Sequence, residues 1–142
     1  MKKFEFIDIT TADVAFLAYG KSLEEVFENS ALAMFEVMVN TSKVEKKEER
    51  RIEAKGFDLE SLLFDWLNEL LFFYGSENLV FSEFKVKIGK KNEEFFLEGI
   101  AKGEKFDEKK HEPKTEVKAV TYHKMKIKKE DGIWKVRVIL DI

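Results

Sequence analysis

The alternation of apolar and polar residues predicts two strands at the start of the chain. Residues 4–9 alternate well enough for a first strand. Residues 14–19 are apolar on both faces, which predicts a second strand that is covered on both sides and closed by Gly20. The segment 10–13 interrupts the apolar pattern between them, so Asp13 should lie at the mouth of the second strand.

Two stretches with apolar residues at three- and four-residue spacing predict amphipathic helices. The first begins at a capping box, in which the Ser22 hydroxyl accepts the Glu25 N–H and the Glu25 side chain reaches back to the Ser22 N–H. The second begins with Asp58 as its N-cap and should end at Gly75 in a left-handed conformation. Its regular apolar stripe favours packing on a sheet, although a partner interface is the alternative.

The remaining pattern is that of β-strands. A mixed-charge run over residues 43–51 leads into a short strand through Ile52 and Ala54. Further strands are predicted at residues 79–81, 84–88, 95–101, 116–128 and 133–140, with a tight hairpin at Asp131-Gly132. The order is two strands, a helix, a strand, a helix and then four or five strands. It predicts an α+β fold with two amphipathic helices packed on a mixed, largely antiparallel β-sheet.

The composition limits the class of protein. A chain of 142 residues suits one domain, residues 1–142, with a continuous core. The absence of cysteine excludes disulfides, zinc-thiolate sites and thiol nucleophiles, and it fits a reducing compartment. The start lacks the apolar region of a signal peptide, and no apolar run is long enough to span a membrane. We therefore expect a cytoplasmic protein.

The charge balance narrows the expected partners. Charged residues make up 37% of the chain, yet they nearly cancel to a formal net charge of -3. No global field therefore draws the chain to nucleic acid or to an anionic membrane, and any contact with RNA has to be local.

The strand predicted at residues 116–128 carries ionisable groups where an ordinary strand carries threonine or valine. Its mostly apolar face takes Val117, Ala119, Thr121, His123, Met125 and Ile127, and its charged face takes Glu116, Lys118, Val120, Tyr122, Lys124 and Lys126. His123 on the apolar face indicates a hydrogen-bonded core or edge histidine rather than a ligand. The simplest role for Lys118 is a surface ion pair with Glu116. His111, among charged residues of the long loop 103–114, should be solvated.

Three residues at the two ends of the chain form a candidate metal site. Asp13 and Asp141 supply carboxylates, and Ile142 supplies a carbonyl oxygen or, if it is the natural end, a terminal carboxylate. Such an all-oxygen set suits calcium, magnesium or manganese rather than a soft ion. The plainer alternatives are a turn aspartate at residue 13 and a solvated chain end. No phosphate loop, serine elbow or nucleophile–base pair is present, which argues against an enzyme that acts alone.

Taken in order along nearly the whole chain, a set of short motifs resembles the archease family. They are Thr11-Ala12-Asp13-Val14, Tyr19-Gly20, Leu23-Glu24-Glu25-Val26-Phe27, residues 65–71, Gly103-Glu104, residues 116–123 (EVKAVTYH) and the closing Leu140-Asp141-Ile142. One position departs from the family, which commonly has histidine where this chain has Thr10. Any role of that histidine is therefore not carried over.

The resemblance implies an accessory protein, not an enzyme, that assists the RtcB-type ligase joining tRNA halves. It implies promotion of ligase guanylylation with GTP and a divalent metal ion, and support of multiple turnover. In the family a metal site is formed by residues that match Asp13, Asp141 and Ile142, and the lysine needed for ligase activation matches Lys118. The alternatives are a general chaperone or a modulator of RNA-modifying enzymes, and a metal-dependent hydrolase that lacks an evident base.

Overall fold

The computed structural model describes residues 1–142 and consists of seven strands, two long helices and two short helical turns. The helices are α1 (Leu23–Met38), α2 (Leu59–Glu77), the short α3 (Glu108–His111) and a 3₁₀ turn at Thr41–Lys43. The strands are β1 (Phe4–Ile9), β2 (Asp13–Gly20), β3 (Glu48–Gly56), β4 (Leu79–Lys91), β5 (Glu94–Lys105), β6 (Ala119–Glu130) and β7 (Ile133–Asp141).

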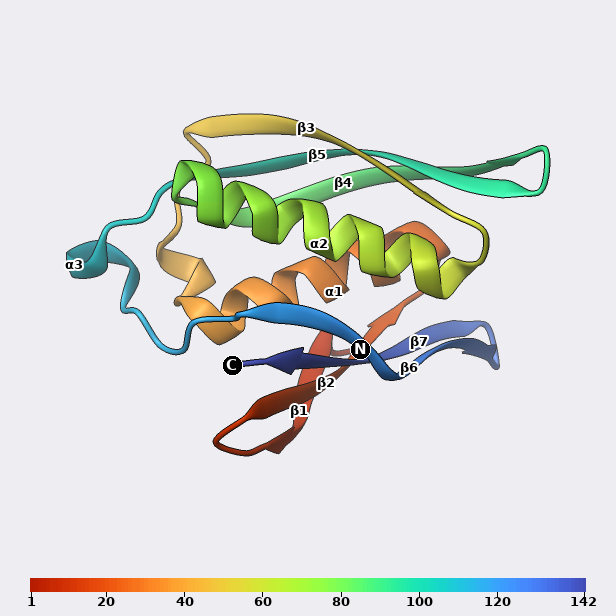
Figure 1. Ribbon diagram of the computed structural model, residues 1–142, viewed down its shortest axis with the longest axis horizontal. Coiled ribbons are helices and arrows are strands. Elements are labelled where there is room, and N and C mark those ends of the chain that lie inside the picture. The colour runs from red at the N-terminus through yellow and green to blue at the C-terminus, as the bar shows by residue number, and fades with distance from the viewer.

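The strands form two separate antiparallel sheets with the long helices between them (Figure 1). Sheet A has the order β1-β2-β7-β6, and sheet B has the order β3-β5-β4. Helix α1 packs against β2 and β4, while α2 packs against β3 and β6, so each helix touches both sheets. The predicted α+β class and element order are confirmed. The strands form two sheets, however, where a single sheet was predicted.

The two long helices lie between the sheets, and each therefore buries more than one narrow stripe of its surface. Thirty-two buried apolar residues from both helices and both sheets form one cluster. Trp66 of α2 is fully buried, and its indole N–H donates to the Phe27 carbonyl of α1 at 3.1 Å. The stripe of α2 therefore lies in the core, which confirms the sheet-packing interpretation over a partner interface.

The ends of the helices differ in part from their predicted caps. The Ser22 side chain accepts the Glu25 N–H as predicted, but the Glu25 carboxylate accepts the N–H of Lys21 rather than that of Ser22. Helix α2 does not end at Gly75. It continues to Glu77, and Asn78 takes the left-handed conformation with φ of 57°. Asparagine tolerates that region, so glycine is not required there.

The β region is more continuous than predicted. Strands β4 and β5 run through the predicted breaks, with a bulge in β4 between Phe81 and Glu83. Strand β6 begins at Ala119, and Val120 points into the core while Ala119 and Thr121 pair with residues on the outer face of β7. The predicted faces are therefore exchanged over residues 119–121, whereas beyond the irregularity Lys126 pairs on the outer face and Ile127 on the inner face, as predicted.

Gly103 and Gly75 form a matched pair for a stability test. A Cβ at Gly103 would lie 1.9 Å from the Val80 carbonyl oxygen, so Gly103→Ala requires the backbone to move. A Cβ at Gly75 in exposed helix would meet no atom within 4 Å. Gly103→Ala should lower the free energy of unfolding by about 3 kcal/mol, whereas Gly75→Ala should raise it by about 0.5–1 kcal/mol. Equal effects in urea denaturation would contradict this packing.

None of the helices combines the length and apolar character that crossing a bilayer requires.

Candidate functional site

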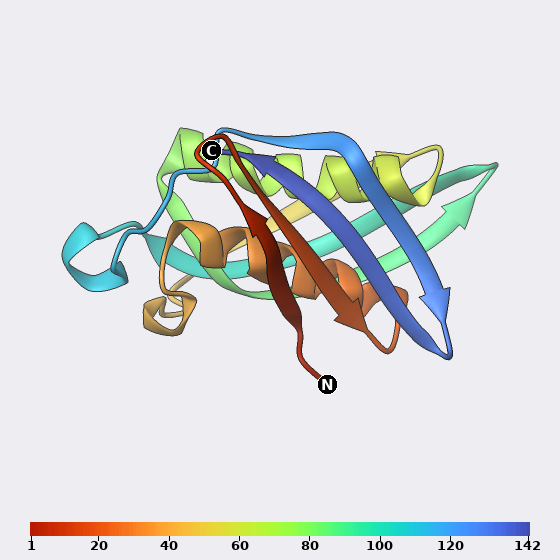
Figure 2. The same cartoon turned by 90° about the horizontal axis from the view of Figure 1, so that it is seen from below.

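Asp13 and Asp141 face each other across the two central strands of sheet A. They are direct register partners at the ends of β2 and β7, so their side chains lie on the same face of the sheet. Asp13 is half-buried and Asp141 is exposed. That face is the outer one, because the helices cover the other (Figure 2). Residues 128 positions apart in the sequence are thus adjacent in the fold.

A tight turn between β1 and β2 orients the Asp13 carboxylate. The Thr10 N–H donates to the Asp13 carbonyl at 2.9 Å. The Thr10 hydroxyl accepts the N–H of Asp13 at 3.0 Å and donates to its Oδ1 at 3.2 Å. No role was predicted for Thr10, although a threonine three residues before an aspartate is a typical hydroxyl-to-backbone turn signal.

Lys118 and Ile142 are held beside the aspartate pair by backbone hydrogen bonds. The Lys118 N–H donates to the Asp141 carbonyl at 2.8 Å, and the Ile142 N–H donates to the Ala12 carbonyl at 3.0 Å. The last residue therefore lies next to the β1–β2 turn, as the position of the C-terminus in Figure 2 shows. The fold thus brings all four predicted site residues to one end of sheet A.

The chemistry of these groups fits a hard divalent cation. Two carboxylates on one face, with oxygens of Ile142 beside them, are ligands that calcium, magnesium and manganese prefer. The set remains small, since the chain has no group of three or more His, Cys, Asp or Glu side chains arranged to hold a metal ion. Asp8 adds negative charge, because its register partner Ala15 lies on the same face as Asp13. We refer to this end of sheet A as the acidic end.

Two other residues of the motif strand have structural surroundings of their own. Tyr122 stacks on Phe64 of α2, with ring centroids 4.2 Å apart and an interplanar angle of 9°. His123 is exposed in the irregular segment between Thr121 and Lys126 of β6, so a core position is wrong, whereas its place on the edge strand of sheet A agrees with the prediction. Because Thr121 pairs on the outer face and Tyr122 contacts α2, strand alternation places His123 on the outer side.

His111 was predicted to be solvated, yet it is fully buried. Its Nδ1 accepts the Asp107 N–H at 2.9 Å, and its Nε2 lies 2.9 Å from the Glu104 carboxylate. These two partners select the neutral tautomer with the proton on Nε2. The charged loop hid this arrangement, because Lys109 and Lys110 beside the histidine suggest a solvated segment.

Glu104 is the centre of that buried cluster. Its carboxylate also accepts the Glu45 N–H at 2.8 Å and pairs with Lys110 at 2.8 Å. Burial raises the pKa of this carboxyl, but hydrogen bonds from Lys110, the Glu45 backbone and His111 outweigh burial and lower the pKa to about 2. The cluster attaches the loop that contains α3 to β5 of sheet B, so its role is structural.

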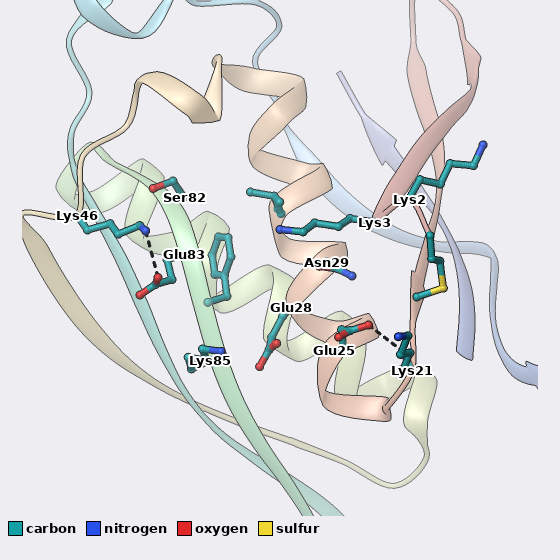
Figure 3. A pocket seen from close by; sticks show the side chains of 13 residues that line it. Lys2, Lys3, Lys21, Glu25, Glu28, Asn29, Lys46, Ser82, Glu83 and Lys85 are labelled. Carbon is teal, nitrogen blue, oxygen red and sulfur yellow. Dashed lines mark hydrogen bonds and ion pairs between the residues drawn. The ribbon is translucent and has the colours of Figure 1, made fainter. Parts of the chain in front are cut away.

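A cleft of about 510 Å³ opens at the other end of β2 (Figure 3). It lies between the start of the chain, α1 and β4, and several of its charges are already paired. Lys46 pairs with Glu83 at 3.2 Å, and Glu28 accepts the N–H of Val86 at 3.0 Å. Seven residues of β2, roughly 23 Å of strand, separate this cleft from Asp13. It is therefore not part of the acidic end.

The chain is similar to known proteins in both sequence and fold. The sequence model of the archease protein family (MTH1598/TM1083) matches residues 4–142. Protein archease of Methanothermobacter thermautotrophicus is 58% identical over 142 residues, covering 100% of both chains. Protein archease of Pyrococcus furiosus is 55% identical over 133 residues, covering 93% of this chain and 94% of that protein.

Two solved structures have the same fold. The solution structure of Methanobacterium thermoautotrophicum protein 1598 has a TM-score of 0.88 at 58% identity and covers 100% of both chains. A crystal structure from Thermotoga maritima, of a protein described as an archease and possible chaperone, has a TM-score of 0.62 at 24% identity. It covers 94% of this chain and 93% of that one, and at this identity it supports the fold alone.

Proposed function

Because this chain belongs to the archease family, we propose that it is an accessory protein that activates an RtcB-type RNA ligase in tRNA splicing. In this proposal it promotes metal-dependent guanylylation of the ligase with GTP and allows the ligase to turn over repeatedly. It joins no RNA itself and acts in the cytoplasm. The ligase is its main partner.

The convergence at the acidic end is the observation that supports this proposal. Asp13 and Asp141 are paired across two strands, while Ile142 and Lys118 are tied to the same strand ends by backbone hydrogen bonds. The fold does not need these two carboxylates for its stability, because uncharged residues are equally stable at exposed strand ends. An exposed, pre-oriented site of this kind suits contact with a second protein.

The residues have distinct proposed roles. Asp13, Asp141 and Ile142 hold a divalent ion, calcium or magnesium/manganese, and this ion supplies positive charge at the contact with the ligase. Lys118 is exposed beside them and contacts the ligase, the phosphates of GTP or a neighbouring carboxylate. The Thr10 hydroxyl keeps the Asp13 carboxylate aimed at the outer face.

The test is guanylylation of the cognate ligase with GTP and manganese, with and without this chain. We expect the chain to raise the amount of guanylylated ligase and the number of joined products. No change in either quantity with the cognate ligase would refute the proposal.

A second candidate function is that of a general chaperone, for which exposed aromatic surface is the supporting observation. Phe57, just before α2, and Phe72, in its second half, are 79% and 62% exposed. A chaperone of this kind would suppress aggregation of unrelated proteins, and Asp13→Asn would not weaken that effect. Suppression that is specific to the ligase would favour the first proposal.

A further inference from the structure

The positive charge of the chain is concentrated in one hairpin. Residues 124–137, which contain the end of β6 and the start of β7, carry six Lys or Arg residues and two acidic residues, a net charge of +4. The whole chain has a net charge of -3, so the remainder carries -7. Such an asymmetry between a hairpin and its domain indicates a local binding surface for an anion.

Four of these cations face one another in two pairs across the strands. Lys126 is the register partner of Arg137, and Lys128 is the register partner of Lys135. Like charges directly opposite on a sheet destabilise it. Only Lys128 has a carboxylate partner, Glu130 at 2.5 Å. An arrangement that costs stability and leaves three of its four cations without a carboxylate partner is explained if an anion lies over it.

The pairs lie on the same outer face of sheet A as the acidic end. Strand alternation places Lys135, Arg137, Ile139 and Asp141 on one side of β7. No helix or loop crosses this face (Figure 2). From Arg137 to Asp141 the strand extends about 13 Å. The face is therefore basic at the hairpin and acidic at the strand ends.

A small hollow lies among the basic side chains. It has a volume of about 220 Å³, and its apolar lining residues are Ile7, Leu17 and Val136. Its other lining residues, Lys126, Lys128, Lys135 and Arg137, are all cationic. A site with an apolar floor and a cationic rim suits a ligand that has both a planar apolar group and regularly spaced negative charge. A nucleotide strand combines these two features, whereas a purely acidic peptide such as polyglutamate lacks the first.

We propose that the outer face of the β6–β7 hairpin binds the phosphate backbone of single-stranded RNA. The four paired cations contact successive phosphates, and the hollow accommodates a base or a ribose. The choice of RNA over other polyanions rests on the proposed function. A binding surface for RNA extends the proposed function, because it gives this chain a direct contact with the RNA that the ligase joins.

The test is binding of a fluorescein-labelled single-stranded RNA of about 20 nucleotides to the protein alone, followed by fluorescence anisotropy without ligase and with EDTA. Four phosphate contacts predict a slope of log affinity against log salt of about -3. Lys126→Gln/Lys135→Gln should bind at least about tenfold more weakly at roughly 50 mM salt, with a slope of about -1.4. Lys85→Gln/Lys87→Gln removes the same charge from exposed positions of β4 and should bind like the wild type.

Three results would overturn this inference. They are no binding by the wild-type protein at low salt, equal weakening in both double variants, and equally tight binding of polyglutamate through the same lysines. The last result would assign the face to an acidic protein. Since no ligase is present, a failure here is separate from a failure of ligase activation.

Discussion

Asp141→Asn is expected to abolish stimulation of the ligase, with a loss of at least about 100-fold, since substitutions one shell further from a metal already cost 10–100-fold. The amide is isosteric with the carboxylate but removes the negative charge. The Asp141 carbonyl still accepts the Lys118 N–H, so the strand ends remain in place. Asp13→Asn should have a similar effect, because it also removes one negative charge. Its amide oxygen can still accept from the Thr10 hydroxyl, so the turn should be retained. The measurement is guanylylation of the ligase at fixed GTP and manganese.

Asp131→Asn is the matched control for these variants. Asp131 lies in the β6–β7 turn with φ of 52°, a conformation that asparagine tolerates well, and it is exposed. The substitution removes the same charge without disturbing the acidic end, so stimulation should be retained. If Asp13→Asn and Asp141→Asn both stimulate as strongly as Asp131→Asn, the site is assigned wrongly.

Glu104→Ala is expected to lower the free energy of unfolding by about 3 kcal/mol. The substitution leaves the buried His111 N–H and the Glu45 N–H without their acceptor. It also removes one of the two carboxylate partners of Lys110, so the loop that contains α3 loses part of its attachment. Urea denaturation at neutral pH measures the effect.

The matched control and the pH dependence test the same cluster. Glu108→Ala replaces an exposed glutamate of the same loop and should change stability by less than about 0.5 kcal/mol.

Because the folded pKa of Glu104 is about 2 and its ordinary value is 4.5, its stabilisation is complete above pH 4.5 and is lost as the pH falls toward 2. Glu104→Gln should therefore show a shallower loss of stability over this range. An unchanged pH profile would contradict the stabilising role of the ionised Glu104 carboxylate.

Much of the fold follows from local signals in the sequence. The helix starts at Ser22 and Asp58 were predicted because their side chains cap the helix within three residues, and such contacts need no tertiary information. The hairpin at Asp131-Gly132 is local in the same way. The proximity of Asp13 and Asp141 is not local, and it was expected only because the chain resembles a known family.

The features that were missed depend on tertiary packing. Alternation along a strand cannot say which sheet a strand joins, so two sheets were predicted as one. His111 lies among lysines in the sequence, and only the approach of Glu104 makes its burial favourable. The faces of Ala119 and Val120 are exchanged because residues 116–118 lie outside β6, so the alternation does not carry over from buried Val117 to buried Val120.

The most direct measurement counts joined RNA molecules per ligase molecule when RNA and GTP are in excess. The ligase alone should stop near one product per molecule. With the wild-type chain it should continue to many products, and with Asp141→Asn it should again stop near one. A ligase that turns over repeatedly without this chain, or equally well with Asp141→Asn, would contradict the proposal that the acidic end of sheet A activates it.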